Sequence, residues 1–274
     1  MAECVPKQAF SKDAKYYAEI LGHGTQDIAH KIVAYISPLV QGSIIHDNAC
    51  GQGVAAKAIM AQSPHSITIH ATDIWPEMVD ATQQVASQNG WPIECAKMPS
   101  ENLTFTDNLF THTVMNFGIR MVQSSTSAAA EVYRTLKPGG TAIFTIWAES
   151  IFIRAIAAGH ERTRPKGTSP PGLKHWMKLE QLSDILQNAG FDPRKIRYEK
   201  AATYIDVTSP RRWSEITWSF MGAGEHGWNE EDEVRWDEAI EASMKVLEEW
   251  EGFEKKDDGT GKITLTAHVV IVEK

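Results

Sequence analysis

Apolar and polar residues follow two recurring patterns along the first half of the chain: short apolar runs, and longer stretches with apolar residues at helical spacing. A short apolar run bounded by turn residues predicts a buried strand, and helical spacing predicts a helix with one buried face. The predicted helices are 11–21, 25–37, 54–62, 76–89 and 126–136, and the predicted strands are 43–47, 67–71, 92–96, 111–116 and 141–147. This alternation predicts a parallel, doubly wound α/β sheet.

The second half of the chain continues the α/β pattern and adds two helices before its last strand. We predict a surface loop at 162–172, a helix at 178–188, an extended stretch at 195–207, helices at 210–221 and 229–250, and a final strand at 263–272. No linker is long enough to separate two domains. The prediction is therefore a single domain over 1–274, with an N-terminal helical segment 1–40, a core 41–150 and a helical lid at 208–252.

Two glycines and an aspartate stand where sheets of this class bind their ligands. Gly51 and Gly53 follow the first predicted strand, and Asp73 follows the second. Ligands of open parallel sheets bind beyond the carboxyl ends of the strands. Glycines there let the backbone approach a ligand closely and free helix amides to donate to an anionic group. A carboxylate at the next strand end can accept both hydroxyls of a ribose.

The same glycine turn occurs in nicotinamide- and flavin-binding enzymes, and a purely structural turn is a further alternative. Three features disfavour a dinucleotide. Ala49 replaces the first turn glycine, Asp47 ends the strand, and Ala56 lies near the place of the missing third glycine. The pattern that cradles a pyrophosphate is incomplete, so an NAD-dependent oxidoreductase is the less favoured interpretation.

The stretch 44–53 resembles motif I of the class I S-adenosylmethionine-dependent methyltransferases. The resemblance continues through 71–78, which is similar to the acidic ribose-binding loop, and through 100–105 and 136–140. The form Asp-Asn-Ala-Cys-Gly also resembles fungal small-molecule methyltransferases of secondary metabolism. The resemblance implies a Rossmann-like, mainly parallel seven-stranded sheet with an antiparallel last strand, N-terminal helices and a helical insertion before that strand. It also implies S-adenosyl-L-methionine as the cofactor.

Carried over residue by residue, the resemblance implies contacts along the whole cofactor. The amino-acid end would meet Asp47, Ala49, Gly51 and Gly53, the ribose Asp73, the adenine Ile74 and Met78, and the sulfonium Asn116 and Phe117, with Tyr17 closing over the cofactor. The sequence departs from the family at Pro99, where an aspartate usually precedes the adenine-facing Ser100. Glu101 and a backbone carbonyl are therefore the candidates for recognising adenine N6.

The acceptor side is predicted from aromatic residues and histidines. The predicted substrate contacts are Phe10, Trp147, Trp213, Trp218 and Met221. A hydroxyl or ammonium acceptor needs a base, whereas a thiolate needs none, and His160 and His175 are the candidate bases. His46 and Cys50 are interpreted as structural. We expect methyl transfer by in-line displacement to an oxygen, nitrogen or sulfur atom of a small molecule, a secondary metabolite.

Charge and composition exclude several other classes. The net charge is −8 and no run of Lys and Arg exceeds a pair, so nucleic acid is not an expected partner. The three cysteines lack disulfide or zinc spacing, which predicts the reducing cytoplasm and no metal site. We find no targeting segment or membrane span and expect a monomer or a weak homodimer.

Two non-methylating interpretations stay open. A methyltransferase-like fold can bind S-adenosylmethionine and catalyse another reaction, such as a pericyclic rearrangement. A non-enzymatic regulator is the other alternative, which the intact Gly51, Gly53 and Asp73 disfavour, because a degenerate module has little need of them.

Overall fold

The computed structural model describes residues 19–20, 22–36, 39–62, 66–166, 168, 176–222 and 228–274. The chain divides into two compact units, each of which is considered by itself. The sheet unit comprises 25–148, 177–201 and 266–274, and the helical unit comprises 1–24, 149–176 and 202–265. Apart from Glu19 and Ile20, the helix predicted at 11–21 lies outside the described residues.

The sheet has the strand order β3-β2-β1-β4-β5-β8-β6, and a short strand, β7, pairs with β8. The strands are β1 (Ile44–Asn48), β2 (Thr68–Asp73), β3 (Ile93–Lys97), β4 (Phe110–Asn116), β5 (Leu136–Trp147), β6 (Ile196–Val207), β7 (Phe253–Lys255) and β8 (Gly261–Glu273). The first five strands pair in parallel, and β8 is antiparallel to β5. This confirms the predicted fold class, to which β7 is an unpredicted addition. The order reverses between β1 and β4, which makes their carboxyl ends the switch point where such sheets bind ligands.

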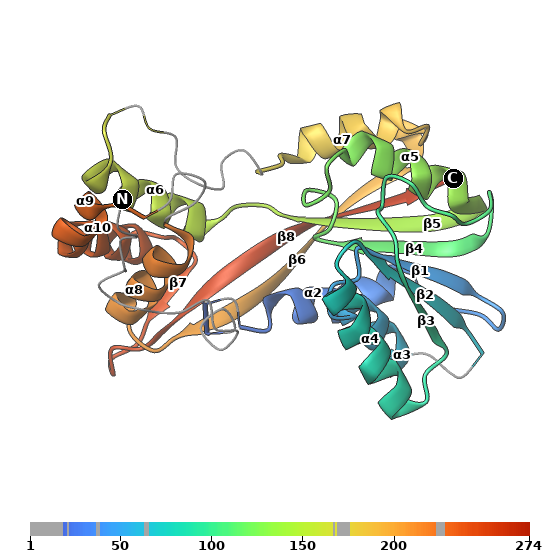
Figure 1. Cartoon of the computed structure of the whole chain (residues 1–274), viewed down its shortest axis with the longest axis horizontal. Helices are drawn as coiled ribbons and strands as arrows, with labels where there is room; N and C mark the ends of the chain where they lie inside the picture. The colour runs from blue at the N-terminus through green and yellow to red at the C-terminus, as the bar shows by residue number, and fades with distance from the viewer. Residues whose placement is uncertain are drawn as a thin grey trace. The chain divides into compact units, whose positions relative to one another are not determined.

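Helices cover both faces of the sheet unit (Figure 1). On one face, α2 (Gly24–Ile36), α3 (Val54–Gln62) and α4 (Pro76–Asn89) bury Ile28, Ile59 and Ala86 in one hydrophobic core. On the other face, α5 (Ser125–Thr135) and α7 (Leu179–Asn188) bury Val132 and Leu182 in a second core. Because both faces are covered, the inner strands are apolar along most of their length, which explains why continuous apolar runs identified them.

The helical unit has a tryptophan-rich core. Its helices are α6 (Ile151–Thr163), α8 (Pro210–Met221), α9 (Glu230–Val234) and α10 (Trp236–Glu248). Trp218 and Trp236 are buried there with Ile156 and Ile240. The lid predicted at 208–252 falls within this unit, and its role stays a prediction. Among the described helices, none combines the length and apolarity that a membrane crossing requires.

The structure of the helical unit differs from the prediction in three respects. Helix α6 was not predicted, and the loop predicted at 162–172 begins inside its last turn. The helix predicted at 229–250 is two helices, because Arg235 leaves the helical region with φ −103° and ψ 26°. Asn229 and Asp232 form a capping box that fixes the short α9 as a separate turn. Helical spacing of apolar residues does not register such a local break.

Candidate cofactor site

The turn between β1 and α3 has the backbone that its glycines predict. Ala49, Gly51 and Gly53 have φ values of +54°, +54° and +70°. A Cβ at Gly51 would meet no atom of the described residues within 4 Å, whereas a Cβ at Gly53 would lie 2.7 Å from Cγ2 of Thr82 in α4. Gly51 therefore leaves open space above the turn, and Gly53 lets α4 pack closely. Ala49 adopts the same left-handed conformation in spite of its methyl group.

Asp73 joins this turn to the end of β2. Its buried carboxylate accepts from the Gly51 N–H through Oδ2 (2.9 Å) and from the Trp75 N–H through Oδ1 (3.0 Å). Each carboxylate oxygen has a second lone pair, so both oxygens can accept a further hydroxyl. A direct hydrogen bond thus joins Asp73, which the sequence predicts to bind the ribose, to Gly51 of the predicted glycine turn.

Asp47 lies on β1, two residues before the turn's first left-handed residue, and is almost completely buried. Its Oδ2 accepts from the Ala56 N–H in the first turn of α3 at 2.9 Å. Burial raises the pKa of the Asp47 carboxyl to about 7, against the lowering effect of the Ala56 hydrogen bond, and nearby Asp73 raises it further. Asp47 therefore fixes the start of α3 and changes charge near neutral pH.

Asn116 is the last residue of β4, and Phe117 follows it. Phe117 has φ +59° and its ring stacks on Trp147 with centroids 4.2 Å apart. Thr145 of β5 accepts from the Phe117 N–H and donates to Asn116 Oδ1 through one hydroxyl. Trp147, a predicted substrate contact, therefore touches a predicted cofactor contact within the sheet unit.

The predicted adenine contacts follow β2 and β3. Ile74 is 44% exposed, Met78 is half-buried and Pro99 is exposed. Ser100 is buried and donates from its hydroxyl to Asn48 Oδ1 at 2.7 Å. The Glu101 carboxylate accepts from the N–H groups of Gln123 and Ser124 through Oε1, at 2.6 and 3.1 Å, and so anchors the residues that lead into α5.

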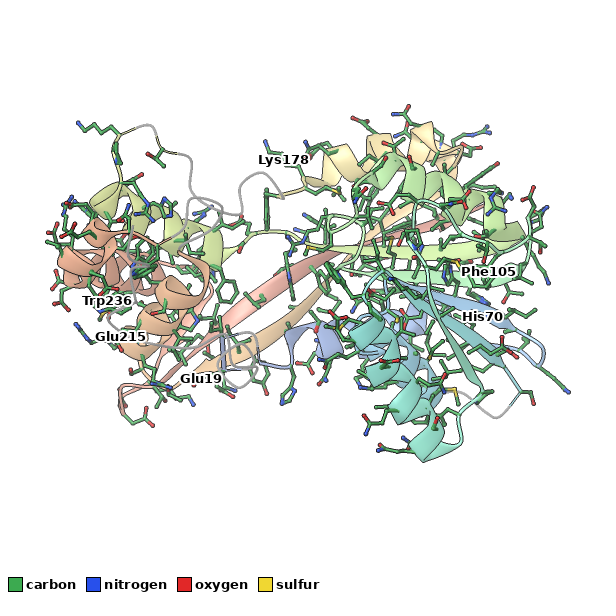
Figure 2. All side chains as sticks on the ribbon, viewed as in Figure 1. Glu19, His70, Phe105, Lys178, Glu215 and Trp236 are labelled. Carbon is green, nitrogen blue, oxygen red and sulfur yellow. The ribbon has the colours of Figure 1, made fainter. Side chains whose placement is uncertain are left out.

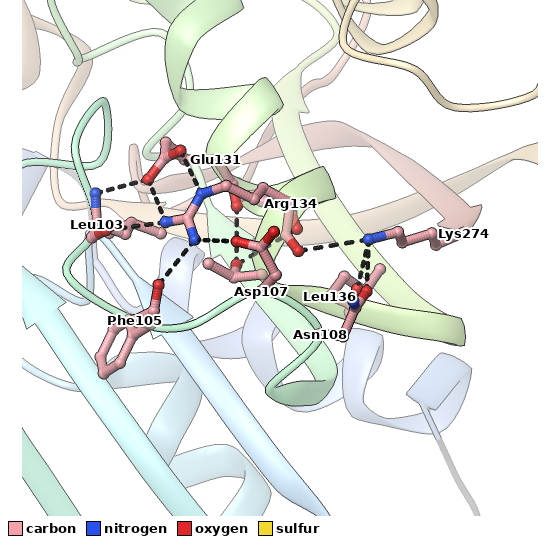
Figure 3. A network of polar contacts seen from close by, with 10 residues as sticks. Leu103, Phe105, Asp107, Asn108, Glu131, Arg134, Leu136 and Lys274 are labelled. Atoms are coloured by element: carbon pink, nitrogen blue, oxygen red, sulfur yellow. Dashed lines mark hydrogen bonds and ion pairs between the residues drawn. The ribbon is translucent and has the colours of Figure 1, made fainter.

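The loop that follows β3 is also held from its far end, by Arg134 of α5 (Figure 3). The guanidinium donates to the carbonyls of Leu103 and Phe105 at 2.9 and 2.8 Å. It forms ion pairs with Glu131 and Asp107, each at 2.7 Å. The loop that carries Pro99, Ser100 and Glu101 is therefore attached to both ends of α5.

The remaining predicted residues lie in the helical unit or outside the described residues. Trp213 is buried against Phe152, with ring centroids 5.5 Å apart, and Trp218 is fully buried. His160 is buried, with Nε2 2.7 Å from the Gly222 carbonyl oxygen and its ring edge-on to Trp218. Phe10, Tyr17 and His175 lie outside the described residues, as does the side chain of Met221.

Two side chains that the sequence pattern interprets as structural are indeed buried in polar or aromatic packing. His46 lies 2.9 Å from the Thr72 hydroxyl and stacks on Phe110, and burial lowers the pKa of its ring to about 3. His70 of the next strand and Phe105 are in edge-to-face contact in the same cluster (Figure 2). Burial also raises the pKa of the Cys50 thiol, which keeps it protonated. Across the described ranges, no group of three or more His, Cys, Asp or Glu residues could hold a metal.

Sequence reasoning missed two threonines of this site. The Thr82 hydroxyl donates to the Gly51 carbonyl at 3.0 Å, and Thr145 holds the end of β4. For Thr145 a weak signal existed, because it is a hydroxyl inside the apolar run of a predicted strand. Thr82 lies in the middle of a helix, where nothing local marks it.

Comparisons with known proteins show that the chain is similar to methyltransferases. A family model described as a methyltransferase domain matches residues 46–144. A ubiquinone/menaquinone biosynthesis C-methyltransferase, UbiE, of Geotalea daltonii is 34% identical over 111 residues, which cover 40% of this chain and 47% of that protein. The chain spans about half the length of the curated relatives it matches.

Two solved structures show that the likeness in fold extends beyond the matched segment. A putative methyltransferase from Bacillus halodurans has a TM-score of 0.58 at 16% identity, over 90% of this chain and 98% of that chain. Phosphoethanolamine N-methyltransferase 2 of Haemonchus contortus, solved with S-adenosylhomocysteine, has a TM-score of 0.56 at 16% identity, over 98% of this chain and 58% of that one. Residues 46–144 are therefore similar to a methyltransferase domain, and the chain shares the fold of these two solved structures.

Proposed function

We propose that this protein is an S-adenosyl-L-methionine-dependent methyltransferase that acts on a small molecule. The observation that carries the proposal is the hydrogen bond from the Gly51 N–H to the Asp73 carboxylate. It lies at the switch point of the sheet, within the segment that matches a methyltransferase domain. When bound, the cofactor supplies an electrophilic methyl group on a sulfonium. The residues present fit it, because the space above Gly51 is open and the Asp73 oxygens keep lone pairs for a diol.

The proposed roles of the site residues follow their places in the fold. Asp73 binds the ribose, Ile74 and Met78 pack on adenine, and the turn at Gly51 contacts the amino-acid end. The Glu101 carboxylate accepts from two backbone amides through Oε1, and Glu101 and a backbone carbonyl of the loop after β3 both stay the proposed partners of adenine N6.

The acceptor side of the reaction concerns the atom that receives the methyl group and the residues that contact it. In-line displacement needs alignment and exclusion of water more than a dedicated base. Trp147 is the proposed acceptor contact in the sheet unit, whereas Trp213 and Trp218 as acceptor contacts, and His160 and His175 as bases, stay predictions from the sequence. Oxygen, nitrogen and sulfur stay the proposed acceptor atoms, and carbon joins them because the Geotalea daltonii relative is named a C-methyltransferase. A role in fungal-type secondary metabolism, a cytoplasmic location and a monomer or weak homodimer are likewise proposals.

Calorimetric titration with S-adenosylhomocysteine tests the cofactor without requiring the acceptor. The wild-type protein should bind, and Asp73→Ala should weaken binding at least about tenfold, or about 1.4 kcal/mol. Asp80→Ala is the matched control, because Asp80 is an exposed aspartate on the neighbouring α4. Absence of wild-type binding would overturn the proposal. Binding without methyl transfer to any acceptor in a screen with labelled methyl groups would favour a non-methylating reaction instead.

A further inference from the structure

Thr145 is a buried hydroxyl that belongs to none of the motifs above but bonds two residues of the site. It lies on β5 opposite Asn116 of β4 and is completely buried. Its Oγ1 accepts from the Phe117 N–H at 2.9 Å and donates to Asn116 Oδ1 at 2.8 Å. One hydroxyl therefore uses both its acceptor and its donor capacity on two consecutive residues.

Those residues begin a turn that the backbone does not favour on its own. Phe117 has φ +59°, a left-handed conformation that is a genuine outlier for a bulky residue and persists only where the surroundings fix it. Phe117 also follows the last residue of β4, so its N–H needs an acceptor that the strand pairing does not provide. Thr145 supplies that acceptor.

The turn at residues 116–118 is in close contact with the turn between β1 and α3. A Cβ added at Gly118 would lie 2.7 Å from the Cβ of Ala49, so Gly118 packs directly on the motif I turn. The Phe117 ring stacks on Trp147, and Asn116 Nδ2 donates to the carbonyl of Thr25 at the start of α2 at 3.2 Å. A shift of residues 116–118 would therefore displace Ala49.

We propose that Thr145 is a positioning residue, which holds the turn 116–118 in the conformation that the thioether and amino-acid end of the cofactor requires. The inference rests on the proposed function, because it assumes that this end of the site receives S-adenosylmethionine. The proposed contacts of the adenosine end are Asp73 at the end of β2, Ile74 directly after it and Met78 in α4, so this end does not depend on the Thr145 hydroxyl. This difference between the two ends makes the role testable.

The test compares S-adenosylhomocysteine with adenosine as calorimetric ligands. Thr145→Val keeps the shape of the side chain and removes the hydroxyl, so it should weaken S-adenosylhomocysteine binding at least about tenfold and adenosine binding less than about twofold. Thr145→Ser restores the hydroxyl and should return S-adenosylhomocysteine affinity to within about threefold of wild type. A merely structural role would lower the affinity for both ligands together.

Thr113 provides the matched control. It is equally buried on β4, and its hydroxyl has no partner among the described residues, so Thr113→Val should leave both affinities unchanged. Unchanged S-adenosylhomocysteine binding by folded Thr145→Val, or equal losses for the two ligands, would overturn the role of Thr145 alone. Failure of the wild-type protein to bind S-adenosylhomocysteine would overturn the proposed function, and the inference with it.

Discussion

Asp47 is a carboxyl group that is shielded from water, so whether it carries charge depends on pH near neutrality. A free aspartate titrates near pH 3.8, and burial raises the pKa of Asp47 in the folded protein to about 7. Between these values the folded chain holds a proton that the unfolded chain has released. The free energy of unfolding therefore falls as pH rises through this window, and the stability present below pH 3.8 is lost once pH exceeds about 7.

Asp47→Asn should remove this pH dependence, because an amide does not titrate and its oxygen can still accept from the Ala56 N–H. We expect the stability of the wild type, measured relative to Asp47→Asn, to decline by at least about 1 kcal/mol between pH 5 and pH 8. Urea unfolding of both proteins at each pH gives the difference between their free energies of unfolding. The contributions of the other titrating groups cancel in this difference, because both proteins contain them. A constant difference over this range would contradict the shifted pKa.

Single residues also show what the sequence could and could not predict at the site. Asp73, Gly51 and Gly53 could be predicted as site residues because their signal is local: they stand at a strand end and in a turn, and their residue types need no knowledge of the fold. Thr145 was missed because its role depends on a partner 28 residues away, which only the pairing of β4 with β5 brings close. The same holds for Thr82, which acts on Gly51 from α4.

At the scale of elements, the loop after β3 is held by side chains of α5 in addition to its own hydrogen bonds, such as the one from the Asn102 N–H to the Pro99 carbonyl. Arg134 is 31% exposed and joins Glu131 and Asp107 to two loop carbonyls (Figure 3). Hydrogen bonds to charged groups contribute more to stability than hydrogen bonds between neutral groups. Loss of the Arg134 guanidinium would leave the carbonyls of Leu103 and Phe105 without this donor. The network therefore connects the stability of α5 with the shape of the proposed adenine site.

Arg134→Met keeps most of the side-chain stem and removes the guanidinium, and it should lower the free energy of unfolding by about 1 to 2 kcal/mol at pH 7. The Arg134 hydrogen bond lowers the pKa of Glu131 from its usual 4.5, so this stabilisation is present above pH 4.5 and is lost as pH falls through the lower, folded value. The gap between wild type and variant should therefore narrow in acid, as urea unfolding at pH 7 and pH 3.5 would measure.

Arg194→Met is the matched control for this variant. Arg194 is exposed and its hydrogen bonds go to Asp192, two residues away, so the substitution should change stability little. Equal effects of the two substitutions would contradict the role of Arg134 in holding the loop.

The bounds of several helices could be predicted from the spacing of apolar residues together with local signals at the helix ends. The bounds predicted for α3, α4 and α8 coincide with the structure, because each helix begins or ends at a residue with a clear local signal, such as Pro76, Gly90 or Pro210. Helix α6 was not predicted, although the Ser150 side chain caps its start. The division of α9 from α10 depends on one residue outside the helical region, which spacing cannot reveal.

At the scale of the whole molecule, the sequence predicted one domain, whereas the structure groups its contacts into two compact units. Composition and linker length do not distinguish these cases, because the chain passes between the units several times without a linker. Whether the units unfold together is a matter of energetics. A buried ion pair between Arg164 and Asp232, at 2.6 Å, lies within the helical unit and allows that unit to be weakened by itself.

Asp232→Ala removes a buried carboxylate from Arg164 and the capping box from Asn229, and should destabilise the helical unit by about 3 kcal/mol. If the units are energetically independent, hydrogen exchange should accelerate in α6, α8, α9 and α10, while α3, α4 and S-adenosylhomocysteine affinity stay as in the wild type. Glu238→Ala, which breaks the exposed pair with Arg235, is the control and should change exchange little. Equal acceleration in α3 and α4 would contradict independence and favour the single cooperative domain that the sequence predicts.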